Sequence, residues 1–260
     1  MKKVAIIGLG LMGGSIAKAL KSNGKYNIIG FDISKETIAL ANKQNLIDEW
    51  WDGTSPIDSD ITILALSPTL TKDFINNKIS LLKENSILTD ICGVKQDIVA
   101  FAEEIAIKNN INFVGGHPMA GRAVNGFENS VDSLFISRSY ILTKTENTKP
   151  EAIEALSEMA YDLGCSDVTI TTPKKHDKLI AFTSQLPHIL AGTYVKSPAS
   201  DEHKGFSAGS YHDVSRVASV DENLWSELFL LNKENLLSEI DIFLKNLTAY
   251  RDAISNDDRQ

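Results

Sequence analysis

The chain has 260 residues, 43% of them hydrophobic, and a formal net charge of −8 at pH 7. This composition is typical of a globular protein, and the acidic balance argues against a nucleic-acid partner, because binding to phosphates needs clustered Lys and Arg. Cys92 and Cys165 lie far apart without metal-ligand spacing, so we expect neither a disulfide nor a metal site. No apolar run reaches the ~18–20 residues of a membrane span. Met1-Lys2-Lys3 leads directly into an apolar run, so we expect no leader, no membrane partner and a cytoplasmic location.

Strands and helices alternate in the first two thirds of the chain. Runs typical of strands are Lys3–Gly8, Asn27–Asp32, Ile61–Leu66, Ser86–Ile91, Asn112–Val114, Ser139–Thr143 and Asp167–Thr171. Helical spacing is found at Leu11–Ser22, Ser34–Asn42, Thr69–Leu82, Gln96–Lys108 and Pro150–Leu163. Ser34 is expected to be the N-cap of its helix. This alternation predicts a parallel, doubly wound sheet.

The pattern changes at Thr172-Pro173, after which we find no good strand. The two residues are typical of an N-cap and a first helical position, and Pro187 should kink the helix that they open. Ser197–Val214 predicts a loop with a short helix, and Leu224–Tyr250 predicts one long helix. We therefore expect an α/β domain at residues 1–172 and an all-α domain at residues 173–260.

The predicted helix Leu224–Tyr250 carries two apolar stripes. One consists of Trp225, Phe229, Leu236, Ile240, Phe243 and Leu247, and the other includes Leu224, Leu228, Leu231 and Ile242. A helix that is apolar on more than one face is buried on more than one side. So small a helical domain can rarely achieve this alone, so we expect a homodimer that forms through it. Packing of the helix against the first domain is the alternative.

A glycine-rich turn follows the first predicted strand. Gly8-Leu9-Gly10-Leu11-Met12-Gly13 matches G-x-G-x-x-G between an apolar strand and an apolar helix, which is the context that supports a dinucleotide-binding fingerprint. Gly8 allows the tight turn, Gly10 lets the backbone approach a pyrophosphate, and Gly13 lets the helix pack closely on the sheet. The N-terminus of that helix, where Leu11 and Met12 lie, would then face the phosphates.

Asp32 ends the second predicted strand, close to the expected ~20 residues after the glycines. Its carboxylate would accept hydrogen bonds from the adenosine ribose hydroxyls and repel a 2′-phosphate. No arginine follows it, and Lys35 is the nearest cation. The cofactor is therefore expected to be NAD, bound in a Rossmann-type domain. A strand-ending Asp that only caps the next helix is the alternative.

Three segments follow neighbouring strands and should line one crevice. They are Ser67-Pro68, Asp90–Lys95 and the turn that contains His117. Ligands of doubly wound sheets bind beyond the carboxyl ends of the strands. A histidine there can accept a proton from a substrate hydroxyl while hydride leaves the same carbon. From the residues alone, His117 is equally well explained as a structural turn residue.

Five segments together resemble the prephenate dehydrogenase family, which includes the arogenate and cyclohexadienyl dehydrogenases. They are Gly8–Ser15, Thr89–Lys95, His117–Gly121, Gln185–His188 and Asp213–Ala218. The resemblance covers nearly the whole chain, and the His-Pro-Met-Ala-Gly and Leu-Pro-His elements are distinctive in combination. It implies NAD(P)-dependent oxidation of a cyclohexadienol with loss of the ring carboxylate as CO2, a step of tyrosine biosynthesis. The resemblance does not distinguish prephenate from arogenate as substrate.

The resemblance also implies roles for individual residues. His117 would take the hydroxyl proton, His188 would contact the substrate, and Arg216 would bind a substrate carboxylate, for which a guanidinium group is well suited. A helix histidine bonded to a carbonyl is the alternative for His188. A surface ion pair with Asp213 or Asp221 is the alternative for Arg216.

The chain departs from the family pattern at several positions. His212 stands where relatives often have lysine, in a loop that can reach across the dimer, and Arg122-Ala123 replaces Thr-Glu. Arg122 would either contact a substrate carboxylate or lie in solvent. Gly93 replaces a serine that supports the catalytic histidine in many relatives. Water, Cys92 or another group must then orient His117. Lys95 either acts electrostatically in the crevice or simply begins the next helix.

Two other functions fit parts of the sequence. A β-hydroxyacid dehydrogenase of the 6-phosphogluconate or 3-hydroxyisobutyrate type would share the fingerprint and a helical second domain. Lys174, Lys175 and Lys178 lie near the start of the second domain, but the Asn and Gly residues expected around a catalytic lysine are absent. A non-catalytic NAD sensor would have no use for His117, His188 and Arg216. Only the polar tail Ser255–Gln260 follows the helical domain, so we expect no appended regulatory domain or fused mutase.

Overall fold

The structure is a computed structural model that describes residues 1–122 and 124–259. It divides into two compact units, Met1–His176 and Asp177–Gln260. The first unit contains one sheet, and its strand order is β3-β2-β1-β4-β5-β6-β7-β8. The strands are β1 Lys2–Ile7, β2 Tyr26–Phe31, β3 Glu49–Trp50, β4 Ile61–Leu64, β5 Ile87–Asp90, β6 Asn112–Pro118, β7 Ser139–Thr143 and β8 Asp167–Thr171. The helices are α1 Leu11–Asn23, α2 Lys35–Lys43, α3 Pro68–Lys78, α4 Gln96–Lys108 and α5 Pro150–Asp162.

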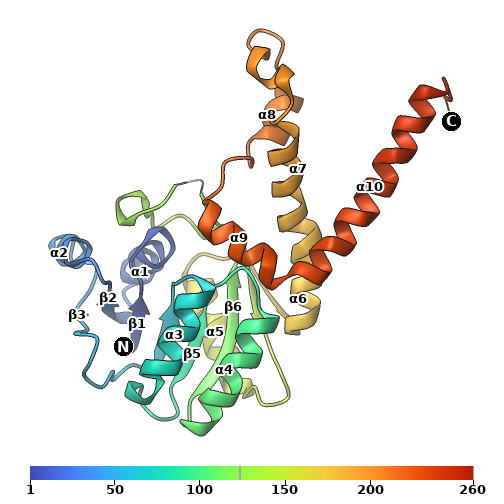
Figure 1. Cartoon of the computed structure of the whole chain (residues 1–260). Helices are drawn as coiled ribbons and strands as arrows, with labels where there is room; N and C mark the ends of the chain where they lie inside the picture. Colours follow the sequence, from blue (N-terminus) through green and yellow to red (C-terminus); the bar gives the residue numbers. More distant parts are fainter. Residues whose placement is uncertain (123, 260) are drawn as a thin grey trace. The chain divides into compact units, whose positions relative to one another are not determined.

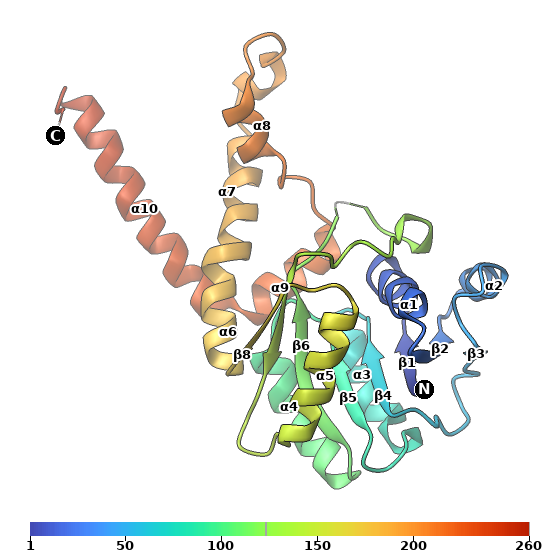
Figure 2. The same cartoon turned by 180° about the vertical axis from the view of Figure 1, so that it is seen from behind.

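Helices cover both faces of the sheet. Side chains that alternate along β1 belong to two separate cores: Val4 and Ile6 pack with α1 and α5, whereas Ala5 and Ile7 pack with α3 and α4. Figure 1 shows α3 and α4 in front of the sheet, and Figure 2, from behind, shows α1 and α5 in front of it. The expected doubly wound fold is therefore confirmed.

The sheet is not parallel throughout, which corrects the expectation. Strands β1 to β6 run parallel, but β7 pairs with β6 in the antiparallel direction, from Gly115 opposite Thr143 to Pro118 opposite Tyr140. A parallel neighbour needs a crossover connection, usually a helix. Between β6 and β7 the described chain contains only a short 3₁₀ turn, Phe127–Asn129. The strand therefore returns antiparallel.

Strand β6 is longer than expected and includes His117. Its glycines permit this extension because neighbouring groups approach the backbone closely. A Cβ on Gly115 would lie 2.5 Å from the Thr143 hydroxyl oxygen, and one on Gly116 would lie 2.7 Å from the Asp90 carbonyl oxygen. Both glycines are therefore packing positions.

The second unit is helical, with no strand among its described residues. Its helices are α6 Pro173–Ile180 (which begins in the first unit), α7 Leu186–Tyr194, α8 Gly209–Ser215, α9 Glu222–Leu231 and α10 Lys233–Ser255. A π-helical turn, Ala181–Gln185, separates α6 from α7. The irregularity expected at Pro187 thus begins one turn earlier, where the N–H of Leu186 reaches the carbonyl of Ala181. No described helix is long and apolar enough to cross a membrane.

The single long helix expected at Leu224–Tyr250 is wrong: α9 and α10 are separate helices. They meet at Asn232, whose φ of −115° and ψ of 24° are not helical. Its buried side-chain amide donates to the carbonyl of Asp177 at 2.9 Å and to Oε1 of Gln185 at 2.8 Å. The chain therefore turns where a buried amide binds the neighbouring helices.

Candidate active site

The glycine turn after β1 is built for close approach of a ligand to the backbone. Gly8 has a φ of +92°, which side-chain-bearing residues rarely adopt. A Cβ on Gly13 would lie 1.9 Å from the Gly8 carbonyl oxygen, so α1 can pack this closely only if residue 13 is glycine. A Cβ on Gly10 would meet no atom within 4 Å, and no side chain caps the N-terminus of α1 at this residue. Open space beside free helix N–H groups fits a pyrophosphate.

The Asp32 carboxylate is held in place by backbone groups. Oδ2 accepts from the N–H of Leu9 at 2.8 Å, and Oδ1 accepts from the N–H of Ser34 at 2.9 Å. Asp32 therefore ties the end of β2 to the glycine turn and to the start of α2. Ser34 is the N-cap of α2, as expected, and accepts from the N–H of Thr37 at 3.2 Å. The half-buried carboxylate keeps further lone pairs for ribose hydroxyls.

The ends of β4, β5 and β6 lie side by side. The register pairs Leu64 with Asp90, and Asp90 with Gly115. Ser67 is the N-cap of α3, and Pro68 is the first helical residue. The three segments expected to share one edge of the sheet thus follow neighbouring parallel strands.

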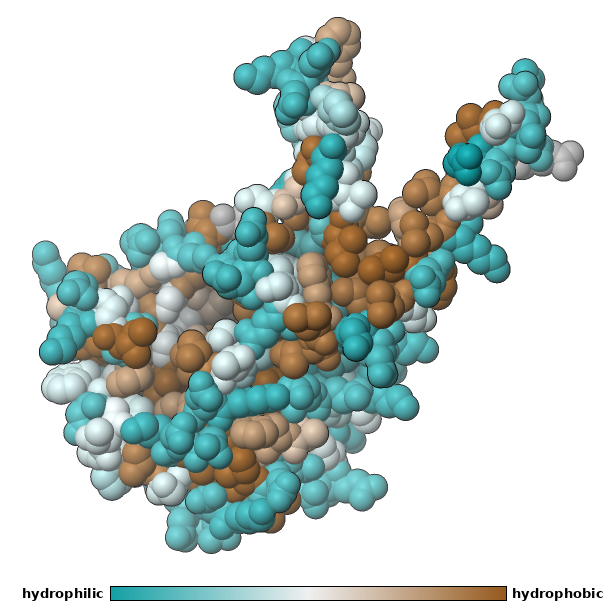
Figure 3. All heavy atoms as spheres, in the orientation of Figure 1, coloured by the Kyte–Doolittle hydropathy of each residue, from teal (hydrophilic) through white to brown (hydrophobic). Residues whose placement is uncertain are grey.

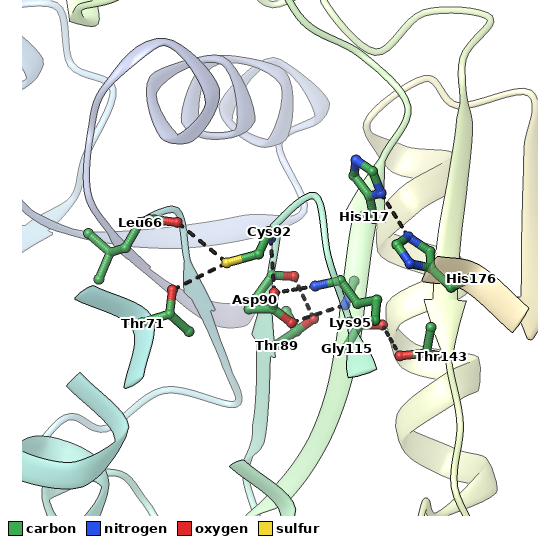
Figure 4. A network of polar contacts seen from close by, with 11 residues as sticks. Leu66, Thr71, Thr89, Asp90, Cys92, Lys95, Gly115, His117, Thr143 and His176 are labelled. Carbon is green, nitrogen blue, oxygen red and sulfur yellow. Dashed lines mark hydrogen bonds and ion pairs between the residues drawn. The ribbon is translucent and has the colours of Figure 1, made fainter. Parts of the chain in front are cut away.

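The His117 ring is held by a second histidine. Its Nδ1 lies 2.8 Å from Nε2 of His176, and the ring planes meet at 60° (Figure 4). His117 is half-buried at the end of β6, whereas His176 is only 2% exposed in the first turn of α6. The expected N-cap of α6 is confirmed, since the Thr172 hydroxyl accepts from the N–H of Lys175 at 3.3 Å.

A buried ion pair lies at the same edge of the sheet. The Lys95 ammonium contacts the Asp90 carboxylate, and neither side chain is exposed (Figure 4). Lys95 also precedes the first residue of α4, so it both begins that helix and carries a buried charge. Burial lowers the pKa of His117 well below its usual 6.5, and the neighbouring His176 and Lys95 lower this pKa further. His117 is therefore neutral at pH 7 and able to accept a proton.

Cys92 does not orient His117. Its thiol lies 3.5 Å from the Thr71 hydroxyl and 3.6 Å from the Leu66 carbonyl oxygen, and burial strongly raises its pKa. The sequence left water, Cys92 or another group to orient His117 in place of the serine missing at Gly93. The structure supports another group, His176.

Arg122 lies in the loop after β6. Its side chain is exposed, and Nη1 donates to the carbonyl of Asn129 at 3.1 Å. Ala123, the second departure from the Thr-Glu pattern, lies outside the described residues.

In the second unit, His188 is half-buried on α7. Its Nδ1 lies 2.8 Å from the carbonyl oxygen of Ser184, and its ring centroid lies 3.8 Å from that of Trp225, with the two planes tilted by 33°. The carbonyl fixes the proton on Nδ1, so Nε2 is left as an acceptor. A carbonyl partner and a ligand contact are thus compatible in this residue.

Arg216 and His212 lie at the end of α8, and both are exposed. The His212 ring meets that of Tyr211 edge-on at 5.7 Å. Over the described ranges, no group of three or more His, Cys, Asp or Glu side chains is arranged to hold a metal.

Family comparisons agree with this geometry. The nucleotide-binding domain of prephenate dehydrogenase matches residues 16–168, and the dimerization domain of prephenate dehydrogenase matches residues 172–260. The chain belongs to the prephenate dehydrogenase family. Family membership makes it an NAD-dependent oxidoreductase.

Individual relatives match over nearly the whole chain. A prephenate dehydrogenase of Lactococcus lactis subsp. cremoris is 33% identical over 100% of this chain and 73% of the relative. The structure of prephenate dehydrogenase from A. aeolicus, in complex with hydroxyphenyl propionate and NAD+, is 32% identical, with a TM-score of 0.88 over 100% of this chain and 93% of that one. Synechocystis arogenate dehydrogenase is 27% identical, with a TM-score of 0.82 over 99% and 93%.

Sequence reasoning missed His176 and left the role of Lys95 open. The two histidines are 59 positions apart, and no spacing rule connects them. The signal for the ion pair was present, because Asp90 ends a buried strand and Lys95 begins a helix after it. The parallel register then places Asp90 beside Gly115 of β6.

Proposed function

We propose that the chain catalyses the NAD-dependent oxidative decarboxylation of prephenate to 4-hydroxyphenylpyruvate. The observation that carries the proposal is the imidazole of His117, held by His176 at the end of β6 in a sheet that also bears the dinucleotide fingerprint. In doubly wound sheets this edge is where cofactor and substrate meet.

The residues around the glycine turn fit NAD. Gly10 leaves the backbone open, Gly13 allows α1 to approach, and the oriented Asp32 carboxylate offers acceptors to ribose hydroxyls. The same carboxylate would repel the 2′-phosphate of NADP. Bound NAD supplies the hydride acceptor. Gly8, Leu11, Met12, Ser67 and Pro68 complete the proposed cofactor site.

His117 moves the proton. It accepts the proton of the substrate hydroxyl while hydride leaves the ring carbon that bears this hydroxyl. Loss of the ring carboxylate as CO2 then leaves a phenolate, which takes the proton back to give the aromatic product. Such a base contributes about 10²–10⁴-fold in rate. The low pKa of His117 keeps the ring unprotonated before the substrate arrives.

Four further residues are proposed to bind the substrate. Prephenate is a dianion, and the exposed guanidinium of Arg216 can bind one carboxylate through two parallel hydrogen bonds. Arg122 adds a second cation, His188 offers Nε2 as an acceptor, and His212 lies one helical turn from Arg216. Arogenate, which carries an amino group in place of the keto group, is the second candidate substrate because an arogenate dehydrogenase has the same fold.

We further propose that residues 1–172 form the NAD-binding domain and that residues 173–260 form a substrate-binding and homodimerisation domain. Helix α10 carries apolar side chains that are more than half exposed: Leu244, Leu247, Tyr250 and Ile254. Figure 3 shows hydrophobic residues gathered along this helix. A second copy of the chain is the partner that would cover them, and sedimentation of the wild type against Leu247→Glu tests this. We also propose that the reaction takes place in the cytoplasm.

An absorbance assay of the purified protein mixed with NAD and prephenate tests the proposed reaction. We expect NADH absorbance to rise, with one CO2 released for each NADH formed. A second assay replaces prephenate with arogenate, and a third replaces NAD with NADP. A protein that binds NAD but forms no NADH with either substrate would overturn the proposal and favour the sensor.

A further inference from the structure

We propose that His176 is a positioning residue, which holds His117 in the tautomer that leaves Nε2 of His117 free to accept the substrate proton. The inference rests on the proposed function, because it assigns the direction of proton transfer from the role of His117 as a base. It identifies the group that takes the place of the missing side chain at Gly93.

The contact between the two rings admits two proton arrangements. A neutral imidazole has one N–H donor and one acceptor nitrogen, and Nδ1 of His117 is 2.8 Å from Nε2 of His176. In one arrangement His117 donates through Nδ1–H, and its Nε2 carries the lone pair. In the other, His176 donates, and Nε2 of His117 must carry the proton. Only the first arrangement leaves a base.

The first arrangement also suits the protonated state. When Nε2 takes up a proton, His117 becomes a cation that still donates through Nδ1 to Nε2 of His176. The hydrogen bond is then charge-assisted and stronger. No ring has to turn during the step, so the ground state is already organised for the transition state.

The surroundings fix the ring of His176. Its backbone N–H donates to the Thr172 carbonyl at 2.9 Å, in a turn that Thr172 also caps. The ring is 2% exposed, so little room is left for another rotamer. His117, at the end of β6, is half-buried.

The charged groups around the pair favour a neutral His117. The groups that act on it are His176 from α6 and Lys95 from the start of α4. Asp90, at the end of β5, is paired with Lys95, and Tyr140 of β7 is a fully buried phenol. The Lys95 ammonium therefore disfavours a positive charge on His117 before the substrate proton arrives.

Three substitutions separate positioning from structure. His176→Leu removes the acceptor, and we expect kcat to fall about 10- to 100-fold, as found for partners that orient other histidines. The KM for NAD should stay within about a factor of two of wild type, a smaller change than the loss of one hydrogen bond would cause. His176→Gln supplies an amide oxygen for Nδ1–H and should restore most of kcat. Lys175→Gln, on the same turn, is the matched control and should behave as wild type.

Histidine ¹⁵N NMR reads the tautomer without any substrate. The chain has five histidines, so variants can assign each ring. In the wild type we expect a protonated Nδ1 and a bare Nε2 on His117, and in His176→Leu a mixture of tautomers. If the Leu variant does not fold, His176→Asn gives the same readout, since its side chain is too short to reach.

The outcomes distinguish the two proposals. A protonated Nε2 on His117 in the wild type, or unchanged kcat and tautomer in the variant that lacks the contact, would overturn the positioning role. Absence of NADH formation by the wild type would instead overturn the proposed reaction, while the NMR result would still report whether His176 sets the tautomer.

Discussion

Lys95 and Asp90 form an ion pair in which neither side chain is exposed, at the edge of the sheet where β6 carries His117. The Asp90 carboxylate also accepts from the backbone N–H of Cys92 at 2.9 Å and of Gly116 at 3.4 Å. One carboxylate thus joins β5, β6 and the start of α4. Burying both charges costs desolvation energy, so the pair is best explained by its place beside the proposed base.

Removal of one partner of this pair should be costly. Lys95→Met leaves Asp90 buried without its cation, and we expect the free energy of unfolding to fall by about 3–5 kcal/mol. Urea denaturation measures the change. The double variant Lys95→Met/Asp90→Asn should recover much of it, and Lys108→Met, which breaks an exposed pair with Glu104, should change little. A single variant as stable as the wild type would show that the pair is not structurally important.

The pH dependence follows from the lowered pKa of His117. The neutral ring is the active form, so kcat/KM should be flat above pH 6.5 and fall only as the pH drops well below this value. The same shift makes the folded state lose stability relative to the unfolded chain as the pH falls below 6.5. We expect more than half of the plateau kcat/KM at pH 6.5. A half-maximal point above pH 6.5 would contradict the environment described for His117.

Asp32 should determine the choice between NAD and NADP. Asp32→Asn removes the negative charge but keeps one oxygen for one of the two backbone N–H groups. We expect the KM for NAD to rise about 10- to 100-fold, because a hydrogen bond to a charged group contributes about 1.5–3 kcal/mol. The ratio of kcat/KM for NADP over NAD should rise as well. Glu36→Gln, nearby on α2, is the control, and an unchanged ratio in Asp32→Asn would exclude Asp32 from the adenosine site.

Arg216 should act on the substrate alone. Arg216→Ala should raise the KM for prephenate about 10- to 100-fold, again from lost charged hydrogen bonds, and leave the KM for NAD nearly unchanged. Arg251→Ala, an exposed arginine on α10, serves as the comparison. Steady-state kinetics with each substrate varied in turn separates the two constants. Equal rises in both constants would indicate a structural role.

Segments with a regular apolar pattern made most of the fold predictable from the sequence. Gln96–Lys108, Ser139–Thr143 and Asp167–Thr171 have the predicted bounds, because each combines a regular apolar pattern with clear end signals. Strand β3 was not predicted, since its two residues, Glu49 and Trp50, are exposed and carry no pattern. The break at Asn232 was also missed, because the apolar stripes continue on both sides and the cause is a tertiary hydrogen bond.

The candidate site was predictable in part, for a related reason. The glycine turn, Asp32 and His117 lie in local sequence motifs that predict their chemistry. His176 has no such motif, and its contact with His117 depends on where α6 begins relative to the end of β6. Contacts that only the fold creates leave no local pattern.

The central claim is that His117 is the base of an NAD-dependent oxidation. The most direct measurement compares His117→Asn with the wild type, with NAD affinity determined by fluorescence titration and turnover from NADH formation. We predict an unchanged Kd for NAD and a kcat lower by about 10²–10⁴-fold. Wild-type turnover in His117→Asn, or a loss of NAD affinity as large as the loss of kcat, would contradict the claim.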